Sequence, residues 1–188
     1  PSQPARTYIS NDSASPKEKS LNVLLVYPRH PDTFWSFKHA LKFVSKRAAY
    51  PPLGLLTVAS LLPAQWQKKL IDMNTDSLKD ADIVWADYVF LSAMGIQKSS
   101  ALEVVKRCNQ LHTKVVAGGP LFALEHEQHE QFEGVDHFVL GEAEAVMPSL
   151  VRDLESGTAQ RFYSSTERPD IRSSPGPAWD LVDIRKYV

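Results

Sequence analysis

Val115-Val116-Ala117-Gly118-Gly119-Pro120 is a short apolar run that ends directly in a pair of glycines. The run is continuous rather than alternating, which is typical of a strand that is covered on both faces. Similar runs lie before and after it, at residues 23–26, 70–72, 89–91 and 138–140. These five runs predict the strands of a buried, parallel sheet.

Segments with helical spacing of apolar residues separate the predicted strands. We expect helices over residues 52–62, 99–111 and 143–155, and weaker ones around 78–86 and 124–132. The helix at 99–111 is expected to start at Ser100-Ala101-Leu102-Glu103, which has the pattern of a capping box. The alternation of strands and helices predicts an α/β, doubly wound, flavodoxin-like (Rossmann-like) fold with a five-stranded parallel sheet in the order 2-1-3-4-5.

The two ends of the chain differ in composition from its middle. Residues 1–20 contain Ser, Pro and Lys with few large apolar groups, which predicts a flexible tail. Residues 21–160 are expected to form the α/β domain. Residues 161–188 contain several prolines and a glycine and are expected to form an extended linker.

Composition and charge exclude several classes of function. The net charge of −1 gives no basic footprint for nucleic acid. No apolar stretch approaches the ~18 residues of a membrane span, and the N-terminal residues have no signal-peptide core. The single cysteine, Cys108, cannot form an internal disulfide, hold an iron–sulfur cluster or complete a Cys-rich zinc site. We therefore expect a cytoplasmic protein with no nucleic-acid partner, no membrane span and no metal-ligand cluster, in which Cys108 belongs to the core.

In a doubly wound sheet the ligand lies beyond the carboxyl ends of the strands, so the loops that follow the strands are the candidate site. Small and polar residues fill three of these loops: Ser92, Ala93, Met94, Gly95 and Gln97 after the third strand, Gly118, Gly119 and Pro120 after the fourth, and Gly141, Glu142 and Glu144 after the fifth. Glycine lets a backbone approach a bulky flat ligand, while Ser, Gln and backbone amides can bind its rim. The alternative for the glycine pair is a tight turn with no ligand.

Several of these motifs resemble those of a known family. Ser92-Ala93-Met94 and Gly118-Gly119 resemble the Ser-x-Leu and Gly-Gly signatures of cobalamin-binding domains, with Met in the place of Leu. The N-terminal B12-binding domain of radical SAM proteins has elements similar to Pro51-Pro52-Leu53-Gly54, Ala117-Gly118-Gly119-Pro120, Gly141-Glu142-Ala143-Glu144 and the closing Pro177-Ala178-Trp179-Asp180-Leu181. The resemblance extends over residues 21–188.

The resemblance implies a cobalamin-binding module that lies against a radical SAM barrel in the same chain. Such a barrel binds a [4Fe–4S] cluster through Cys-x-x-x-Cys-x-x-Cys, cleaves S-adenosylmethionine and supports methyl transfer or rearrangement. This sequence has no such cysteine motif and begins with Pro1, so we expect a fragment without its barrel and without activity of its own. The cofactor contacts that the resemblance implies are Pro28, Pro52, Leu53, Gly54, Ser92, Ala93, Met94, Gly95, Gln97, Gly118, Gly119, Pro120, Gly141, Glu142 and Glu144.

The third cobalamin signature, Asp-x-His-x-x-Gly after the first strand, is absent. The resemblance therefore implies that cobalt receives no imidazole from that motif, and we expect an open or water-occupied lower face. His30 follows the first strand but lacks the Asp partner, so a surface or hydrogen-bonding role is expected. His126 and His129 are expected on a solvated acidic helix face rather than on a metal.

Two other functions remain open at the level of the sequence. One is a stand-alone flavodoxin-like protein that binds FMN or a nucleotide, although Pro28-Arg29-His30 supplies neither a Ser/Thr-rich phosphate loop nor a G-x-G-x-x-G cradle. The other is a non-catalytic interaction domain that has kept the fold and lost the cofactor, since a fold alone does not carry a function.

Overall fold

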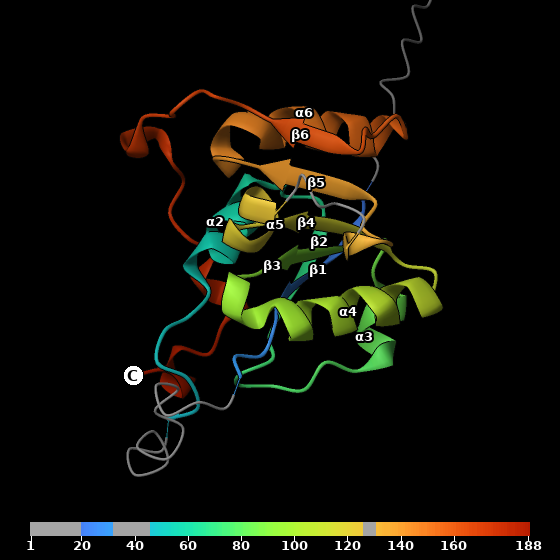
Figure 1. Ribbon diagram of the computed structural model, residues 1–188. Coiled ribbons are helices and arrows are strands. Elements are labelled where there is room, and N and C mark those ends of the chain that lie inside the picture. Colours follow the sequence, from blue (N-terminus) through green and yellow to red (C-terminus); the bar gives the residue numbers. More distant parts are fainter. Residues whose placement is uncertain (1–19, 32–45, 126–130) are drawn as a thin grey trace, which may run out of the picture.

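The computed structural model describes residues 20–31, 46–125 and 131–188. Its centre is a sheet in which every pair of neighbouring strands is parallel. The strands are β1 (Asn22–Tyr27), β2 (Gln67–Asp72), β3 (Tyr88–Ser92), β4 (Lys114–Gly118), β5 (His137–Leu140) and β6 (Phe162–Ser164). Their order across the sheet is β2-β1-β3-β4-β5-β6 (Figure 1).

Helices cover both faces of the sheet. The core cluster on one face includes residues of α3 (Asp80–Trp85), α4 (Lys98–Gln110) and α5 (Pro120–Glu125). The cluster on the other face includes residues of α2 (Leu53–Leu61) and α6 (Ala143–Ser156). Residues 23–26 of β1 alternate between the two clusters and are fully buried, as expected for a strand covered on both sides.

The predicted fold class is confirmed, but the predicted number of strands is wrong. The sheet has six strands rather than five, because Phe162–Ser164 pairs in parallel with β5 at the edge. The Phe162 ring stacks on Phe138 of β5 with centroids 5.2 Å apart, and the Tyr163 hydroxyl donates to Asp153 of α6. This strand has three residues and only Tyr163 is buried, so it leaves no continuous apolar run in the sequence.

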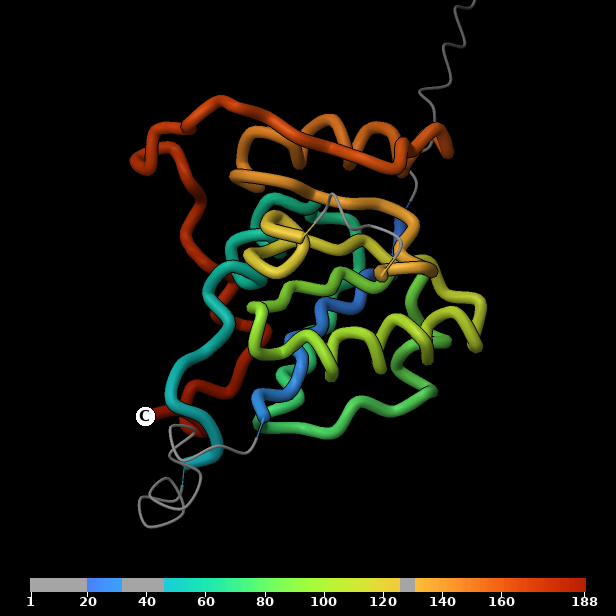
Figure 2. The backbone as a smooth tube through the Cα atoms, in the orientation of Figure 1, coloured from blue at the N-terminus to red at the C-terminus, as the bar shows by residue number. Residues whose placement is uncertain are grey.

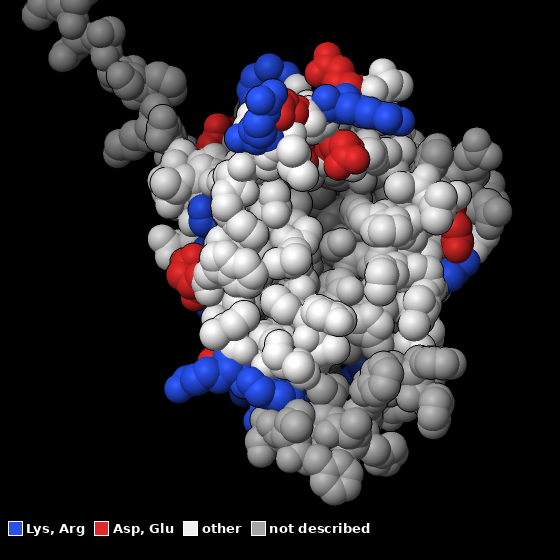
Figure 3. All heavy atoms as spheres, turned by 90° about the vertical axis from the view of Figure 1, so that its left-hand side faces the viewer, with Lys and Arg blue, Asp and Glu red and all other residues white. Residues whose placement is uncertain are grey.

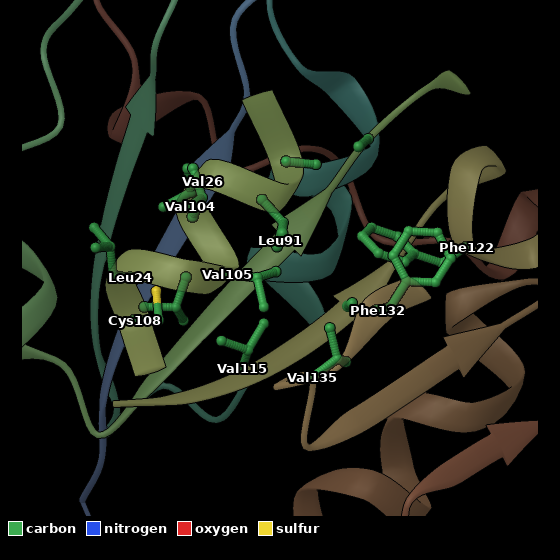
Figure 4. Close-up of a cluster of buried hydrophobic side chains, with 14 of the residues drawn as sticks. Leu24, Val26, Leu91, Val104, Val105, Cys108, Val115, Phe122, Phe132 and Val135 are labelled. Atoms are coloured by element: carbon green, nitrogen blue, oxygen red, sulfur yellow. The ribbon is translucent and has the colours of Figure 1, made fainter. Parts of the chain in front are cut away.

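The start of α4 also differs from the expected position. The helix begins at Lys98, directly after the 3-10 turn η2 (Gly95–Gln97), so Ser100 lies inside the helix rather than at its cap. The Ser100 hydroxyl instead accepts a hydrogen bond from the backbone N–H of Arg29. Cys108 is fully buried on the inner face of α4, which confirms its place in the core (Figure 4).

The last part of the chain, residues 176–187, packs against the domain; we call it the C-terminal segment. It contains two single 3-10 turns, η5 (Trp179–Leu181) and η6 (Ile184–Lys186), and follows a similar turn, η4 (Ile171–Ser173). Its Gly176 carbonyl accepts from Ser60 of α2, and the Ala178 amide donates to the Leu56 carbonyl. Leu181 packs on the same core cluster as α2 and η5 contacts β2, so the segment covers β2 beside α2 (Figure 2).

No helix in the described part of the chain is both long and apolar enough to cross a membrane.

Candidate functional site

The carboxyl ends of the strands form one edge of the molecule, which faces the viewer in Figure 3. The register places Ser92 beside Gly118, and Gly118 beside Val139, so the loops after β3, β4 and β5 are neighbours. Charged side chains lie toward the margin of this face, while its hollowed middle is formed by uncharged residues (Figure 3). The loops after β3, β4 and β5 therefore meet at this edge, and we call its uncharged, hollowed middle the neutral edge.

The predicted site residues differ in how accessible they are at this edge. Some are exposed, namely Leu53, Gly54, Met94, Gly95, Pro120, Gly141 and Glu142. Others are half-buried, namely Ser92, Gly118, Gly119 and Glu144, and a third set is buried, namely Pro28, Pro52, Ala93 and Gln97. The first set can meet a ligand directly, whereas the third set shapes the loops from below.

The glycine pair after β4 has a structural reason within the chain itself. Gly119 has φ +87°, and a Cβ at this position would lie 2.6 Å from the Ser92 Oγ and 3.2 Å from the Ala93 carbonyl oxygen. A Cβ on Gly118 would lie 3.3 Å from the Val139 carbonyl oxygen. Gly119 thus allows the loops after β3 and β4 to touch, and Gly118 allows the end of β4 to pack closely against β5.

Gly54 and Gly95 differ from that pair, because nothing in the described structure requires glycine there. Neither has a positive φ, and a Cβ on either would meet no atom within 4 Å. Gly54 lies in the first turn of α2. Glycine in place of alanine lowers the stability of a helix by up to roughly 1 kcal/mol in its interior, and by less near its end. These two exposed glycines leave bare backbone at the edge, which is what close approach of a flat ligand demands.

Exposed apolar side chains accompany the bare backbone. The exposed fraction is 51% for Leu53, 39% for Met94 and 57% for Ile96. Ile96 is not among the predicted site residues. Its position in the loop after β3, between Gly95 and Gln97, could have identified it from the sequence. Together these side chains can cover an apolar ligand surface that the backbone alone cannot.

Gln97 is occupied inside the protein. Its side chain is 1% exposed, its Nε2 donates to the Pro28 carbonyl at 2.6 Å, and its Oε1 accepts from the Met94 amide at 2.9 Å. Gln97 therefore ties the loop after β3 to the loop after β1, so the expected direct contact with a cofactor stays a prediction.

The two acids after β5 have different surroundings. The Glu144 carboxylate accepts a hydrogen bond from the Ser174 hydroxyl, so it holds the chain that leads into the C-terminal segment. Glu142 is the N-cap residue of α6, but its side chain makes no capping hydrogen bond. Glu142 is the acid that remains exposed at the edge.

A buried polar cluster lies at the ends of β1 and β2, and the sequence analysis missed it. Asp72 is 2% exposed; its Oδ1 accepts from the backbone N–H and the Nδ2 of Asn74, and its Oδ2 accepts from the Tyr187 hydroxyl. Burial raises the pKa of the Asp72 carboxyl above its ordinary value. Burial, followed by the nearby Asp72 charge, also raises the pKa of Tyr187.

His30 belongs to the same cluster. Its backbone N–H donates to the Asn74 Oδ1 at 2.8 Å, its ring Nδ1 lies 3.2 Å from the same oxygen, and its ring meets Tyr27 edge-on. These contacts fit the hydrogen-bonding role expected for His30. His126 and His129 lie outside the described residues.

A separate cavity of about 600 Å³ lies beside β2 rather than at the ends of β3 to β5. Its lining mixes basic, acidic and neutral polar groups, including Arg29, Arg47, Asn74, Asp76 and Lys79. Asp76 is already paired with Lys186, and Arg47 donates to the Thr75 carbonyl. The cavity is charged and partly self-paired, which distinguishes it from the neutral edge.

The residues at the neutral edge fit a corrin. A corrin is a broad, flat macrocycle fringed by amides, so it needs bare backbone, uncharged walls and hydrogen-bonding groups at its rim. Gly54 and Gly95 supply open backbone, Leu53 and Met94 supply apolar cover, and Ser92 supplies a hydroxyl.

Comparison with known proteins identifies the family of this chain. The family model described as "B12 binding domain" matches residues 44–151, more than half of the chain. The chain is 36% identical over 167 residues to a protein of Synechocystis sp. named "Uncharacterized methyltransferase", covering 89% of this chain and 31% of the relative. It is 30% identical over 173 residues to the hopanoid C-2 methylase of Rhodopseudomonas palustris, covering 91% of this chain and 33% of the relative. The chain thus spans about a third of the length of these relatives, and it belongs to the B12-binding domain family.

Proposed function

We propose that this chain is the cobalamin-binding module of a B12-dependent radical SAM methyltransferase. The observation that carries the proposal is the pair of exposed glycines, Gly54 and Gly95, whose bare backbone is required by no packing contact of the described chain. Membership in the B12-binding domain family supports cobalamin as the ligand. The names of the two relatives, a methyltransferase and a methylase, support methyl transfer.

In this proposal the residues of the chain bind and orient the ring and exclude water. The backbone at Gly54 and Gly95 lies against the corrin, Leu53, Met94 and Ile96 cover its apolar surface, and the edge after β5 meets its amide rim. Gly118 and Gly119 keep the loops beneath it close together. Cobalamin, when bound, would supply a cobalt centre suited to alkyl-group transfer. The residues of this chain would contribute by holding the cofactor in position.

The remaining machinery belongs to another part of the parent protein. A [4Fe–4S] cluster needs several thiolates, and this chain has one cysteine, which is buried in the core. We infer that the cluster and S-adenosylmethionine are bound by a radical SAM barrel in cis, and that this barrel faces the neutral edge. The module is then the cofactor carrier and the barrel is the site of reaction.

We propose that the loop after β1 would offer no imidazole ligand to a bound cobalamin. His30 makes two contacts with Asn74, and the Pro28 carbonyl accepts from both Gln97 and Asn74, so the loop is held in a conformation of its own.

The test is retention of ligand by the purified chain. The protein is mixed with hydroxocobalamin or with FMN, desalted, and its visible spectrum is recorded. We expect retained cobalamin and no flavin. Retained flavin would favour the flavodoxin-like alternative, and retention of neither would favour a non-catalytic interaction domain.

Glycine variants sharpen this test. A double variant, Gly54→Ala with Gly95→Ala, is expected to fold at least as well as the wild type, because both added methyl groups point into open space. It is expected to bind hydroxocobalamin at least about tenfold more weakly, since a methyl group forced into a close contact costs ~1–3 kcal/mol. Gly176→Ala is the matched control, because a Cβ there is equally unobstructed and lies outside the proposed site.

A further inference from the structure

The C-terminal segment is anchored at the carboxyl edge by its last residues. Tyr187 is 2% exposed and forms a parallel bridge with Ala48. The Arg47 amide donates to the Lys186 carbonyl at 2.8 Å, and the Lys186 ammonium lies 2.6 Å from the Asp76 carboxylate. The chain is therefore fixed at this point by backbone pairing, an ion pair and burial of an aromatic ring.

The Tyr187 hydroxyl begins a chain of hydrogen bonds that reaches the proposed cofactor site. It donates to the Asp72 Oδ2 at 3.1 Å, and the Asn74 Nδ2 donates to the Asp72 Oδ1 at 2.7 Å. The same Asn74 Nδ2 lies 3.2 Å from the Pro28 carbonyl, which also accepts from Gln97 at 2.6 Å. The sequence of bonds thus runs from the C-terminal segment through the ends of β2 and β1.

The series of hydrogen bonds that starts at Tyr187 ends in the loop after β3. The Gln97 Oε1 accepts from the Met94 amide at 2.9 Å, and Met94 directly precedes the exposed Gly95. The intermediate side chains of Asp72 and Gln97 are 2% and 1% exposed, so water does not readily replace their partners. A buried acceptor that loses its donor destabilises the hydrogen bonds around it. A change at Tyr187 can therefore alter the hydrogen bond at Met94.

We propose that Tyr187 is a positioning residue for the cofactor site, acting through Asp72, Asn74, Pro28 and Gln97 on the loop that carries Met94 and Gly95. The proposal rests on the cobalamin-binding function proposed above. It gives the C-terminal segment two tasks at once. The segment covers β2. It also links the part of the chain that leads toward the inferred barrel to the conformation of the loop that is proposed to bind the corrin.

The test compares two buried tyrosines that each donate to an aspartate. Tyr187→Phe removes the bond to Asp72 and keeps the ring. Tyr163→Phe is the matched control, because the Tyr163 hydroxyl donates to Asp153 at 2.9 Å on α6, away from the hydrogen-bond chain. Each variant is titrated with hydroxocobalamin, and hydrogen exchange of the Met94 amide is measured in the cofactor-free protein.

We expect Tyr187→Phe to raise the Kd for hydroxocobalamin by about fivefold or more, comparable to the loss of one net hydrogen bond. We also expect the Met94 amide to exchange at least about fivefold faster in this variant. Tyr163→Phe is expected to leave both quantities within about twofold while it lowers the melting temperature. Equal effects of the two variants on Kd and exchange, or no effect of Tyr187→Phe on either, would overturn the proposal.

The two measurements separate this inference from the proposed function. If the wild-type chain binds no hydroxocobalamin, the cofactor proposal fails. Exchange of the Met94 amide then decides the coupling alone: faster exchange in Tyr187→Phe supports it, and unchanged exchange refutes it.

Discussion

Replacing Gly119 by alanine is the substitution for which the structure gives the most definite magnitude. Gly119 has φ +87°, a region where an L-residue pays roughly 1–2 kcal/mol. The added Cβ would lie 2.6 Å from the Ser92 Oγ, and 3.2 and 3.3 Å from the carbonyl oxygen and the nitrogen of Ala93. The Ala93 carbonyl is itself held by the Leu121 amide at 2.9 Å, so the backbone there cannot move freely.

The expected cost is the sum of the conformational and contact contributions. Overpacking of this kind adds about 1–3 kcal/mol, which gives about 2–5 kcal/mol for Gly119→Ala. Urea unfolding followed by circular dichroism measures this loss as a lower midpoint at unchanged slope. A domain has a total stability of about 5–15 kcal/mol, so the shift is large enough to measure without abolishing folding.

Gly157→Ala separates the two contributions. Gly157 has φ +73°, but a Cβ there would meet no atom within 4 Å, so this variant is expected to show only the conformational cost of roughly 1–2 kcal/mol. Adding Ser92→Ala to Gly119→Ala removes the nearest atom and should recover part of the loss, as a non-additive pair. If Gly119→Ala proves no more costly than Gly157→Ala, the close packing of the loops after β3 and β4 is refuted.

Three further predictions concern titration and cobalt ligation. Burial raises the pKa of the Cys108 thiol to about 12, so a thiol reagent at pH 8 should label the folded chain far more slowly than the chain in urea; equal rates would contradict this. Because the pKa of Asp72 is raised in the folded protein, ionisation favours unfolding as pH rises above its ordinary value of about 4. The unfolding free energy of the wild type should therefore fall relative to Asp72→Asn from pH ~4 upward and then level off, and a difference independent of pH would contradict this. The electron paramagnetic resonance spectrum of bound cob(II)alamin should show no histidine nitrogen, and a spectrum with nitrogen splitting that His30→Ala abolishes would disprove the open lower face.

The core of the fold could be predicted from the sequence because it depends on local patterns. Each of β1, β3, β4 and β5 contains a continuous apolar run, and such runs stand out against the amphipathic helices between them, whereas β2 has only Leu70-Ile71. The sixth strand could not be predicted in this way. Phe162–Ser164 is an edge strand with one buried residue, and it is defined by pairing with β5 rather than by its own composition.

The sequence predicts which loops meet at the candidate site, but it does not predict which partners the individual side chains of these loops bind. The topology and the glycines locate the edge, whereas Gln97 turns out to bind Pro28, which is 69 residues away. Tyr187 and Asp72 are separated by 115 residues, and neither lies in a recognisable motif. Contacts between residues so far apart in the sequence depend on how the sheet, helices and C-terminal segment pack together. The residue pattern of a single segment does not encode that packing.

The most direct test of the account is to record the amide resonances of the isotope-labelled chain during titration with hydroxocobalamin. We predict that the largest shifts occur at Gly54, Met94 and Gly95, with smaller ones at Gly118 and Gly119. Shifts confined to the cavity beside β2, or no shifts at all, would contradict the proposal that the neutral edge binds cobalamin.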